Sequence, residues 1–274
     1  MTSSEKPILS TKTELDGSAC SDSFLFESNG LQVPVRIQLS HEHKNRMVVL
    51  FNGAINRGKA PDPRFVFQRS SWAEHFNAHT LNIADPTLQP TNNLSIGWGQ
   101  AGGENRARHA YAEIINWAAN ALNIHPKNIV LYGSSAGGFQ ALHTAPHVRN
   151  AKCVVNNPQI DWTYYFPAHV NKLIQEIYPN QDVETLRKDN PSAVSVVNSF
   201  SQEKYAPDMT YLLNAASRTD YNHQAPHLFR YLENGGHLDS RKCTLVVYSA
   251  PKTGHNPLPK NRTIDEINKA LDAS

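Results

Sequence analysis

Short apolar runs and amphipathic stretches alternate along most of this chain. Residues 47–51 form a continuous apolar run between turn residues, which predicts a strand that is buried on both faces. Residues 104–122 carry apolar side chains along one stripe, which is typical of a helix packed against a sheet. Further strands are expected over residues 80–84, 128–132, 153–155, 209–215 and 244–248, and further helices over residues 70–78, 135–145 and 223–233.

This alternation predicts the α/β class, with a mostly parallel central sheet and helices on both faces. A last helix is expected to begin near Thr263, because Thr263 and Glu266 have the spacing of a capping box. Its apolar residues Ile264, Ile267 and Leu271 would then face inward.

The start of the chain predicts an antiparallel edge for this sheet. Apolar runs at residues 24–27 and 31–39 flank Asn29-Gly30, and Asn-Gly between two such runs is the strongest short signal for a hairpin. Residues 1–20 are polar and are expected to form a tail. The remaining residues, 21–274, are expected to form one domain, because no linker, repeat or low-complexity tract interrupts them.

Composition and charge narrow the class of protein. The 274 residues include 26 basic and 24 acidic side chains, and this balance gives no electrostatic footprint for nucleic acid or an anionic membrane. No apolar run approaches the roughly 18 residues of a membrane span. Cys20, Cys153 and Cys243 are odd in number and widely spaced, which argues against a disulfide framework or a zinc site. We therefore expect a protein of the reducing cytoplasm that binds no metal.

The motif with the clearest chemistry is Gly133-Ser-Ser-Ala-Gly137, which matches G-x-S-x-G. An apolar run precedes it and a helical pattern follows it, which is the strand–turn–helix context of a nucleophile elbow. Ser135 is therefore the candidate nucleophile. The alternative is a glycine-rich turn that binds a phosphate or has no chemical role.

A serine nucleophile needs a base, and the base needs an acid that orients it, in the chain order Ser, acid, His. His255 is the candidate base, because it follows the last expected strand and Gly254 gives its loop backbone freedom. Asp220 is the candidate acid, since it follows an expected strand at its carboxyl end. Asp161 is the rival acid.

An acyl-transfer intermediate needs two N–H donors for its oxyanion. We expect these donors to be the backbone N–H groups of Ala136, directly after the nucleophile, and of Ala54, in the loop after the first central strand. Basic residues follow in the same loop region, and a solvated loop is a simpler interpretation for them than a rim for an anionic substrate. They are Arg57, Lys59 and Arg64.

These residues resemble the α/β-hydrolase superfamily over nearly the whole chain. A narrower resemblance, to bacterial α/β-hydrolase-like proteins associated with surface-polysaccharide production, rests on five short motifs in the same order. They are Phe51-Asn-Gly-Ala54, Ala84-Asp-Pro-Thr-Leu88, Leu94-Ser-Ile-Gly-Trp-Gly99, Gly133-Ser-Ser-Ala-Gly-Gly138 and Asn157-Pro-Gln-Ile-Asp161. This chain departs from many lipases and esterases in having Asn-Gly where they have His-Gly.

The resemblance implies a serine enzyme that transfers an acyl group, often acetyl, to a sugar hydroxyl, or hydrolyses an ester there. Its expected partners are a small acyl donor and a carbohydrate, with no resident cofactor and with acetyl-CoA as a candidate donor for a transferase. A non-catalytic carbohydrate-binding or secretion-accessory protein on the same fold is the alternative. A serine peptidase is a weaker one, because no motif indicates peptide recognition.

Two further features concern the substrate. The alternation is interrupted between residues 162 and 204 by a helical stretch with three prolines, which predicts a lid-like insertion over the carboxyl edge of the sheet. Aromatic faces beside a polar cleft suit sugar rings, although aromatics in such a lid can equally be core packing. The candidate substrate-binding residues are Trp98, Gly99, Trp162, Tyr164 and Tyr165.

Overall fold

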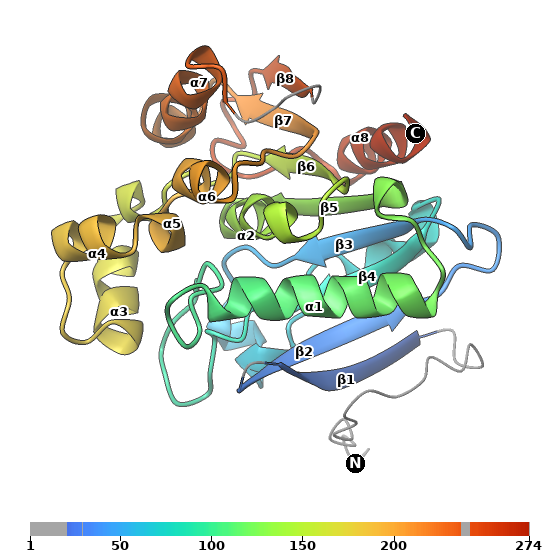
Figure 1. The fold of residues 1–274 in the computed structure, drawn as a ribbon, viewed down its shortest axis with the longest axis horizontal. Helices are drawn as coiled ribbons and strands as arrows, with labels where there is room; N and C mark the ends of the chain where they lie inside the picture. Colours follow the sequence, from blue (N-terminus) through green and yellow to red (C-terminus); the bar gives the residue numbers. More distant parts are fainter. Residues whose placement is uncertain (1–20, 29, 237–241, 274) are drawn as a thin grey trace.

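An eight-stranded sheet forms the centre of the molecule (Figure 1). The structure is a computed structural model, and it describes residues 21–28, 30–236 and 242–273. The strand order is β1-β2-β4-β3-β5-β6-β7-β8, and within it only β2 runs antiparallel to its neighbours. The strands are β1 (Ser21–Ser28), β2 (Leu31–Gln38), β3 (Met47–Phe51), β4 (His79–Ile83), β5 (Ile129–Ser134), β6 (Lys152–Asn156), β7 (Met209–Asn214) and β8 (Cys243–Tyr248).

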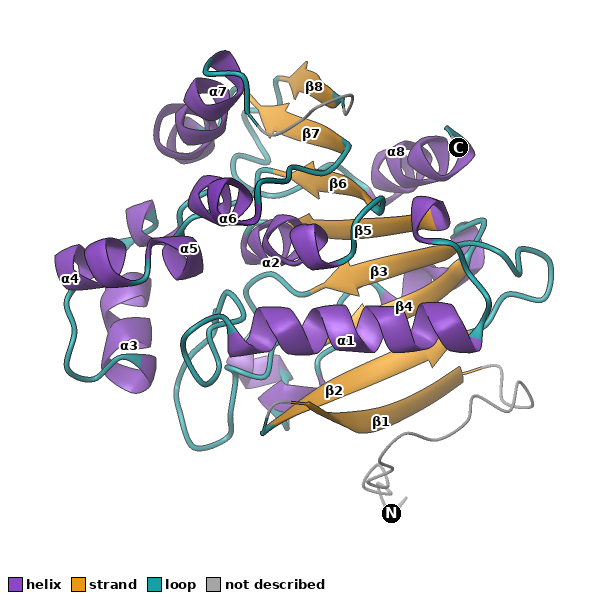
Figure 2. Cartoon of the chain, viewed as in Figure 1, coloured by secondary structure: helices purple, strands orange, loops and turns teal. Residues whose placement is uncertain are grey.

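Helices cover both faces of this sheet (Figure 2). They are α1 (Arg106–Ala121), α2 (Ala136–Thr144), α3 (Pro167–Ile177), α4 (Val183–Asp189), α5 (Pro191–Val194), α6 (Val196–Glu203), α7 (Ala225–Glu233) and α8 (Lys260–Asp272). Short 3-10 turns lie at Arg57–Lys59, Pro63–Phe65, Ser70–His75, Pro126–Asn128, Ala145–His147 and Trp162–Tyr164, and a π-helical turn at Asp220–Gln224.

The central strand β3 is apolar throughout because it buries both of its faces. Every residue of β3 is buried, and successive side chains point to opposite sides of the sheet. Val49 belongs to the larger core under α1 and α2, whereas its neighbours Val48 and Leu50 belong to a second core under α8. Two separate cores thus fix the sheet in the middle of the molecule.

The α/β fold class is confirmed, and most element boundaries lie within one or two residues of the expected ones. Residues 70–75 form a 3-10 turn in place of the expected helix. The capping box at Thr263 is wrong: α8 begins at Lys260, and the buried Thr263 hydroxyl donates to the Leu258 carbonyl at 3.0 Å. Ile264, Ile267 and Leu271 are buried as expected.

The predicted tail over residues 1–20 and the conformation of Asn29 lie outside the described residues, while β1 and β2 pair antiparallel on either side of residue 29. The interrupting segment is helical, and Figure 1 shows α3, α4 and α5 beyond the end of the sheet toward which β3 points. Its action as a lid stays a prediction. None of the helices in the described part of the chain has the length and apolar character needed to cross a bilayer.

Candidate active site

Ser135 lies in the tight turn between β5 and α2, with φ 57° and ψ −125°. Residues other than glycine rarely adopt such a backbone conformation, which persists only where the surroundings enforce it. The surroundings here are closely packed backbone: a Cβ on Gly133 would lie 2.1 Å from the Gly137 carbonyl carbon, and one on Gly137 would lie 2.6 Å from the Phe51 oxygen. The glycines of the motif therefore permit the elbow and hold the serine at the carboxyl edge of the sheet.

The structure brings together the three residues expected to form a triad. His255 Nε2 lies 2.8 Å from Ser135 Oγ, and His255 Nδ1 lies 2.7 and 2.9 Å from the two carboxylate oxygens of Asp220. Asp220 is completely buried on the π-helical turn after β7, and it accepts a further bond from Ser217 Oγ at 2.5 Å. The histidine side chain is 30% exposed, so one edge of the ring faces the nucleophile and solvent while the acid behind it is shielded.

The rival acid, Asp161, does not lie beside His255. It caps the 3-10 turn after it, where its carboxylate accepts bonds from the Thr163 N–H at 2.9 Å and from the Thr163 hydroxyl. Burial raises the pKa of this carboxyl, and the two bonds from Thr163 oppose that rise. Asp161 therefore has a structural role in this structure, and Asp220 occupies the position expected of the acid.

The loop that carries His255 is held by buried amide side chains. Asn156, Asn157 and Asn214, called the asparagine cluster below, lie at or directly after the carboxyl ends of β6 and β7, and all three are fully buried. Each bonds the backbone of this loop. The bonds run from Asn157 Nδ2 to the His255 carbonyl (3.1 Å), from Asn214 Nδ2 to the Gly254 carbonyl (2.7 Å), and from the Leu258 N–H to Asn156 Oδ1 (2.7 Å).

Gln159 also contacts the reacting hydroxyl, which was not expected from the sequence. Its Oε1 accepts a bond from Trp98 Nε1 at 3.1 Å, and an indole N–H can only donate. Ser135 Oγ lies 3.2 Å from this oxygen and 3.1 Å from the amide nitrogen, which also lies 3.5 Å from His255 Nε2. The signal was available, because Gln159 belongs to one of the five motifs and lies three residues after the end of β6.

The two expected oxyanion donors belong to separate elements of the chain. Ala136 is the first residue of α2, and Ala54 is an exposed residue that lines the same cleft as Ser135. The Gln68 side chain holds the Ala54 loop, since its Oε1 accepts from the Gly53 N–H at 2.9 Å and its Nε2 donates to the Ala54 carbonyl at 2.8 Å. The Gly53 N–H is thereby occupied, and Ala54 stays the candidate in this loop.

Of the five candidate substrate-binding residues, only Tyr165 lines the cleft. Trp98 and Trp162 are fully buried and stacked with ring centroids 5.4 Å apart, so their rings offer no accessible face to a sugar in this structure. Gly99 is buried against the Tyr111 ring. Tyr164 is exposed but packs on Arg187, whose guanidinium lies 4.1 Å from the ring centroid. None of these four residues lines the cleft, and substrate binding by them stays a prediction.

The cleft beside Ser135 has a volume of about 610 Å³, within the range of small-molecule sites. It is lined by Gly53, Ala54, Gln68, Arg69, Trp72, Ser134, Ser135, Tyr165, His255, Asn256, Pro257, Leu258 and Lys260. Within residues 21–28, 30–236 and 242–273, no group of three or more His, Cys, Asp or Glu residues is arranged to hold a metal ion.

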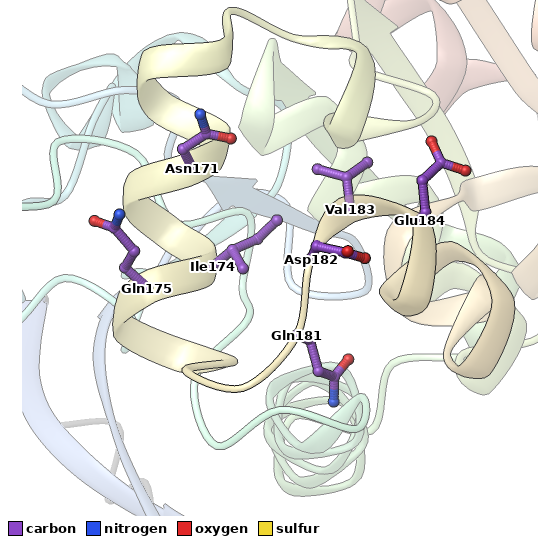
Figure 3. Close-up of a pocket in the computed structure, with 7 residues that line it drawn as sticks. All are labelled: Asn171, Ile174, Gln175, Gln181, Asp182, Val183 and Glu184. Atoms are coloured by element: carbon purple, nitrogen blue, oxygen red, sulfur yellow. The ribbon is translucent and has the colours of Figure 1, made fainter.

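Figure 3 shows a second hollow, of about 390 Å³, between α3 and the segment that leads into α4. None of its lining residues belongs to the serine site. Its carboxylate Asp182 caps α4 by accepting a bond from the Thr185 N–H at 2.7 Å. This hollow is thus separate from Ser135.

The strand order and the serine elbow define a protein of the α/β-hydrolase superfamily, as the resemblance implied. The prolyl oligopeptidase family matches residues 76–272, and the chain belongs to this family. No curated protein sequence gives a match.

Solved structures of several enzymes share the fold at low sequence identity. A capsule O-acetyltransferase of Neisseria meningitidis serogroup A, a histidine-to-alanine mutant in complex with CoA, has a TM-score of 0.62 and 14% identity over 92% of this chain and 94% of that one. Dipeptidyl peptidase 4 of Porphyromonas gingivalis has a TM-score of 0.64 and 12% identity over 93% of this chain, but only 35% of its own length is covered. A Pyrobaculum calidifontis esterase has a TM-score of 0.60 and 13% identity over 92% and 84%.

Proposed function

We propose that this protein is a serine-dependent acyl enzyme that acts on a carbohydrate-type substrate, by O-acetyl transfer to a sugar hydroxyl or by ester hydrolysis there. The observation that carries the proposal is the continuous chain of hydrogen bonds from Ser135 Oγ through His255 to the buried Asp220. A serine hydroxyl is a poor nucleophile by itself, and such a chain supplies the base and its orienting acid.

In the acylation step, Ser135 Oγ attacks the carbonyl carbon of the ester and its proton passes to His255 Nε2. Asp220 keeps the other ring nitrogen protonated, which leaves Nε2 free to accept. The N–H groups of Ala136 and Ala54 bond the oxyanion of the tetrahedral intermediate. When the intermediate collapses, His255 returns the proton to the leaving oxygen or sulfur, and an acyl-Ser135 ester remains.

In the second step, His255 removes a proton from the acceptor, which attacks the acyl carbon and releases Ser135. Water as acceptor gives a carboxylic acid, whereas a sugar hydroxyl gives a new ester. The amide nitrogen of Gln159 faces Ser135 Oγ and can donate to this oxygen as it leaves. Gln159 therefore joins the proposed catalytic residues.

The carbohydrate substrate rests on analogy with the capsule O-acetyltransferase, which shares the fold over nearly all of both chains. That structure is in complex with CoA, so acetyl-CoA is our proposed donor if the reaction is a transfer. The proposed partners are accordingly a carbohydrate and a small acyl donor, and the proposed location is the cytoplasm.

A serine peptidase is the second candidate, because the chain belongs to the prolyl oligopeptidase family. The proposed triad would perform peptide-bond cleavage by the same two steps, with an amine as the leaving group. The two candidates differ in substrate and not in nucleophile. A non-catalytic protein on this fold would lack the acyl-serine altogether.

The test is labelling with a fluorophosphonate probe, which reacts with activated serines. Wild-type protein is expected to be labelled and Ser135→Ala is not, while Ser201→Ala, an exposed serine on α6, serves as the matched control and stays labelled. Equal labelling of wild type and Ser135→Ala would overturn the nucleophile, and no labelling of wild type would favour the non-catalytic alternative.

The substrate class is then assigned with an acetyl donor, oligosaccharide acceptors and peptide anilides. Incubation with an acetyl donor and oligosaccharides, followed by mass spectrometry, is expected to give acetylated sugar or free acetate, and little release of p-nitroaniline from peptide anilides. Fast anilide cleavage without any action on acetyl esters would replace the first candidate with the second.

A further inference from the structure

Arg69 is a cation at the nucleophile with its charge uncompensated. It lines the cleft beside Ser135, and its guanidinium donates to Ser134 Oγ at 2.7 Å, one residue before the nucleophile. The central carbon of the guanidinium, Cζ, lies 5.2 Å from the centroid of the Tyr132 ring and 5.6 Å from that of the Trp72 ring. The guanidinium also donates to Gln68 Oε1 at 3.4 Å. These contacts fix the orientation of a group that carries five N–H donors.

No carboxylate of the described residues lies within salt-bridge distance of Arg69. Lys260, the first residue of α8, lines the same cleft and likewise has no acidic partner in the described part of the chain. The lining itself contains no Asp or Glu, and the triad acid is completely buried behind His255. The cleft consequently presents positive charge to a ligand.

Two arginines of the preceding loop have other partners. Arg57 donates to the carbonyls of Gln89, Asn92 and Leu94, so it ties loops together. Arg64 forms an ion pair with Asp62 at 2.6 Å. The sequence favoured a solvated loop over an anion-binding rim for the loop cations, and it did not single out Arg69, which lies in the cleft beside the nucleophile.

We infer that the substrate of this site carries an anionic group, a phosphate or a carboxylate, close to the ester, and that Arg69 and Lys260 bind it. A guanidinium matches the geometry of both groups with paired, charge-assisted hydrogen bonds. An aromatic-lined, positively charged cleft thus favours an acidic saccharide or a phosphorylated one over a neutral sugar. This inference rests on the proposed function but concerns binding and not the covalent step.

The test therefore measures binding to Ser135→Ala by calorimetry, which requires no turnover. Phenyl phosphate and benzoate are the anionic probes, and benzamide is the neutral probe of the same shape. At low salt the anions are expected to bind about tenfold or more tightly than benzamide, and this preference should shrink as ionic strength rises. The relative affinities of phenyl phosphate and benzoate distinguish the two anions. Equal affinity for charged and neutral probes would overturn the inference.

Charge-neutralising variants locate the effect. In the Ser135→Ala background, Arg69→Gln is expected to lower the affinity for the anions about tenfold while benzamide changes little, and Arg69→Lys to lower it less. Lys260→Gln should act in the same direction. Arg262→Gln and Lys269→Gln remove equal charges from exposed positions of the same helix as Lys260 and are expected to have no effect. Equal losses for anions and benzamide would reduce Arg69 to a structural role.

Fluorophosphonate labelling of the wild-type protein separates the two proposals. If labelling occurs but phenyl phosphate does not slow it, the anion site fails and the serine chemistry stands. If the anions bind with the stated preference but no labelling occurs, the serine chemistry fails and the anion site stands.

Discussion

Ser135 Oγ and His255 Nε2 lie 2.8 Å apart, yet different interactions hold the two residues in place. The serine lies in an elbow whose flanking glycines, Gly133 and Gly137, are packed so closely against backbone atoms that neither position has room for a side chain. The histidine comes from a half-exposed loop whose backbone is bonded by the asparagine cluster. Close packing fixes the position of Ser135, and buried hydrogen bonds fix the position of His255.

The contrast indicates which changes the molecule can tolerate. Close-packed backbone cannot relax around an added atom, so errors at the elbow affect folding itself. A loop held by hydrogen bonds can shift while the sheet below stays folded, so errors there affect catalysis first. A misplacement of about 1 Å can cost about a hundredfold in rate.

Removing the charge on the triad acid is expected to have the largest effect. Asp220→Asn should lower kcat by about 10⁴-fold, because the histidine then adopts the wrong tautomer, while the fold is retained. Asp161→Asn removes another buried carboxylate and should leave most of the activity. Steady-state kinetics on an acetyl ester measures both, and the reverse ranking would assign the acid to Asp161.

Next comes the elbow. Gly133→Ala places a methyl group 2.1 Å from backbone atoms of Gly137 and is expected to cost about 3 kcal/mol or more in the free energy of unfolding. Gly58→Ala is the control, since a Cβ there meets only the Asn56 side chain, at 3.4 Å. Denaturant unfolding measures the difference. Similar stabilities for the two variants would show that the elbow can relax, against the contrast drawn here.

The asparagine cluster is expected to act mainly on rate. Asn214→Ala removes the donor to the Gly254 carbonyl and should lower kcat by about tenfold to a hundredfold. Asn268→Ala removes an amide that donates to the His75 carbonyl at 3.0 Å, far from the cleft along α8. It should lower stability without a matching loss of kcat. Equal effects of the two on kcat would remove the special role of the loop.

The smallest effect concerns pH. Burial, followed by the charge of Arg108, lowers the pKa of His147 from 6.5 to about 4. Since the unfolded chain takes up this proton first, the stabilisation is complete above pH 6.5 and is lost as pH falls toward 4. His147→Gln should flatten this part of the stability curve, which pH-dependent denaturation measures. An unchanged slope would exclude His147 as its source.

The sequence predicted the fold from its periodicity, and it singled out Ser135 because local spacing encodes an elbow. His255 and Asp220 followed from chain order and from their places after strands. Gln159 lies within one of the five motifs, so its position carried a signal, but its contact with Ser135 did not follow from chain order. Arg69 and the asparagine cluster could not be found in this way, since their roles depend on contacts between segments far apart in the chain. The complete burial of Trp98 and Trp162 depends on such contacts too.

The acyl-serine itself provides the most direct measurement. Wild-type protein mixed with p-nitrophenyl acetate, quenched in acid and digested, is expected to yield one peptide that is heavier by an acetyl group, with the modification on Ser135. Asp220→Asn should accumulate this species more slowly. Acetylation at another residue, or release of p-nitrophenol without any modified peptide, would contradict the account.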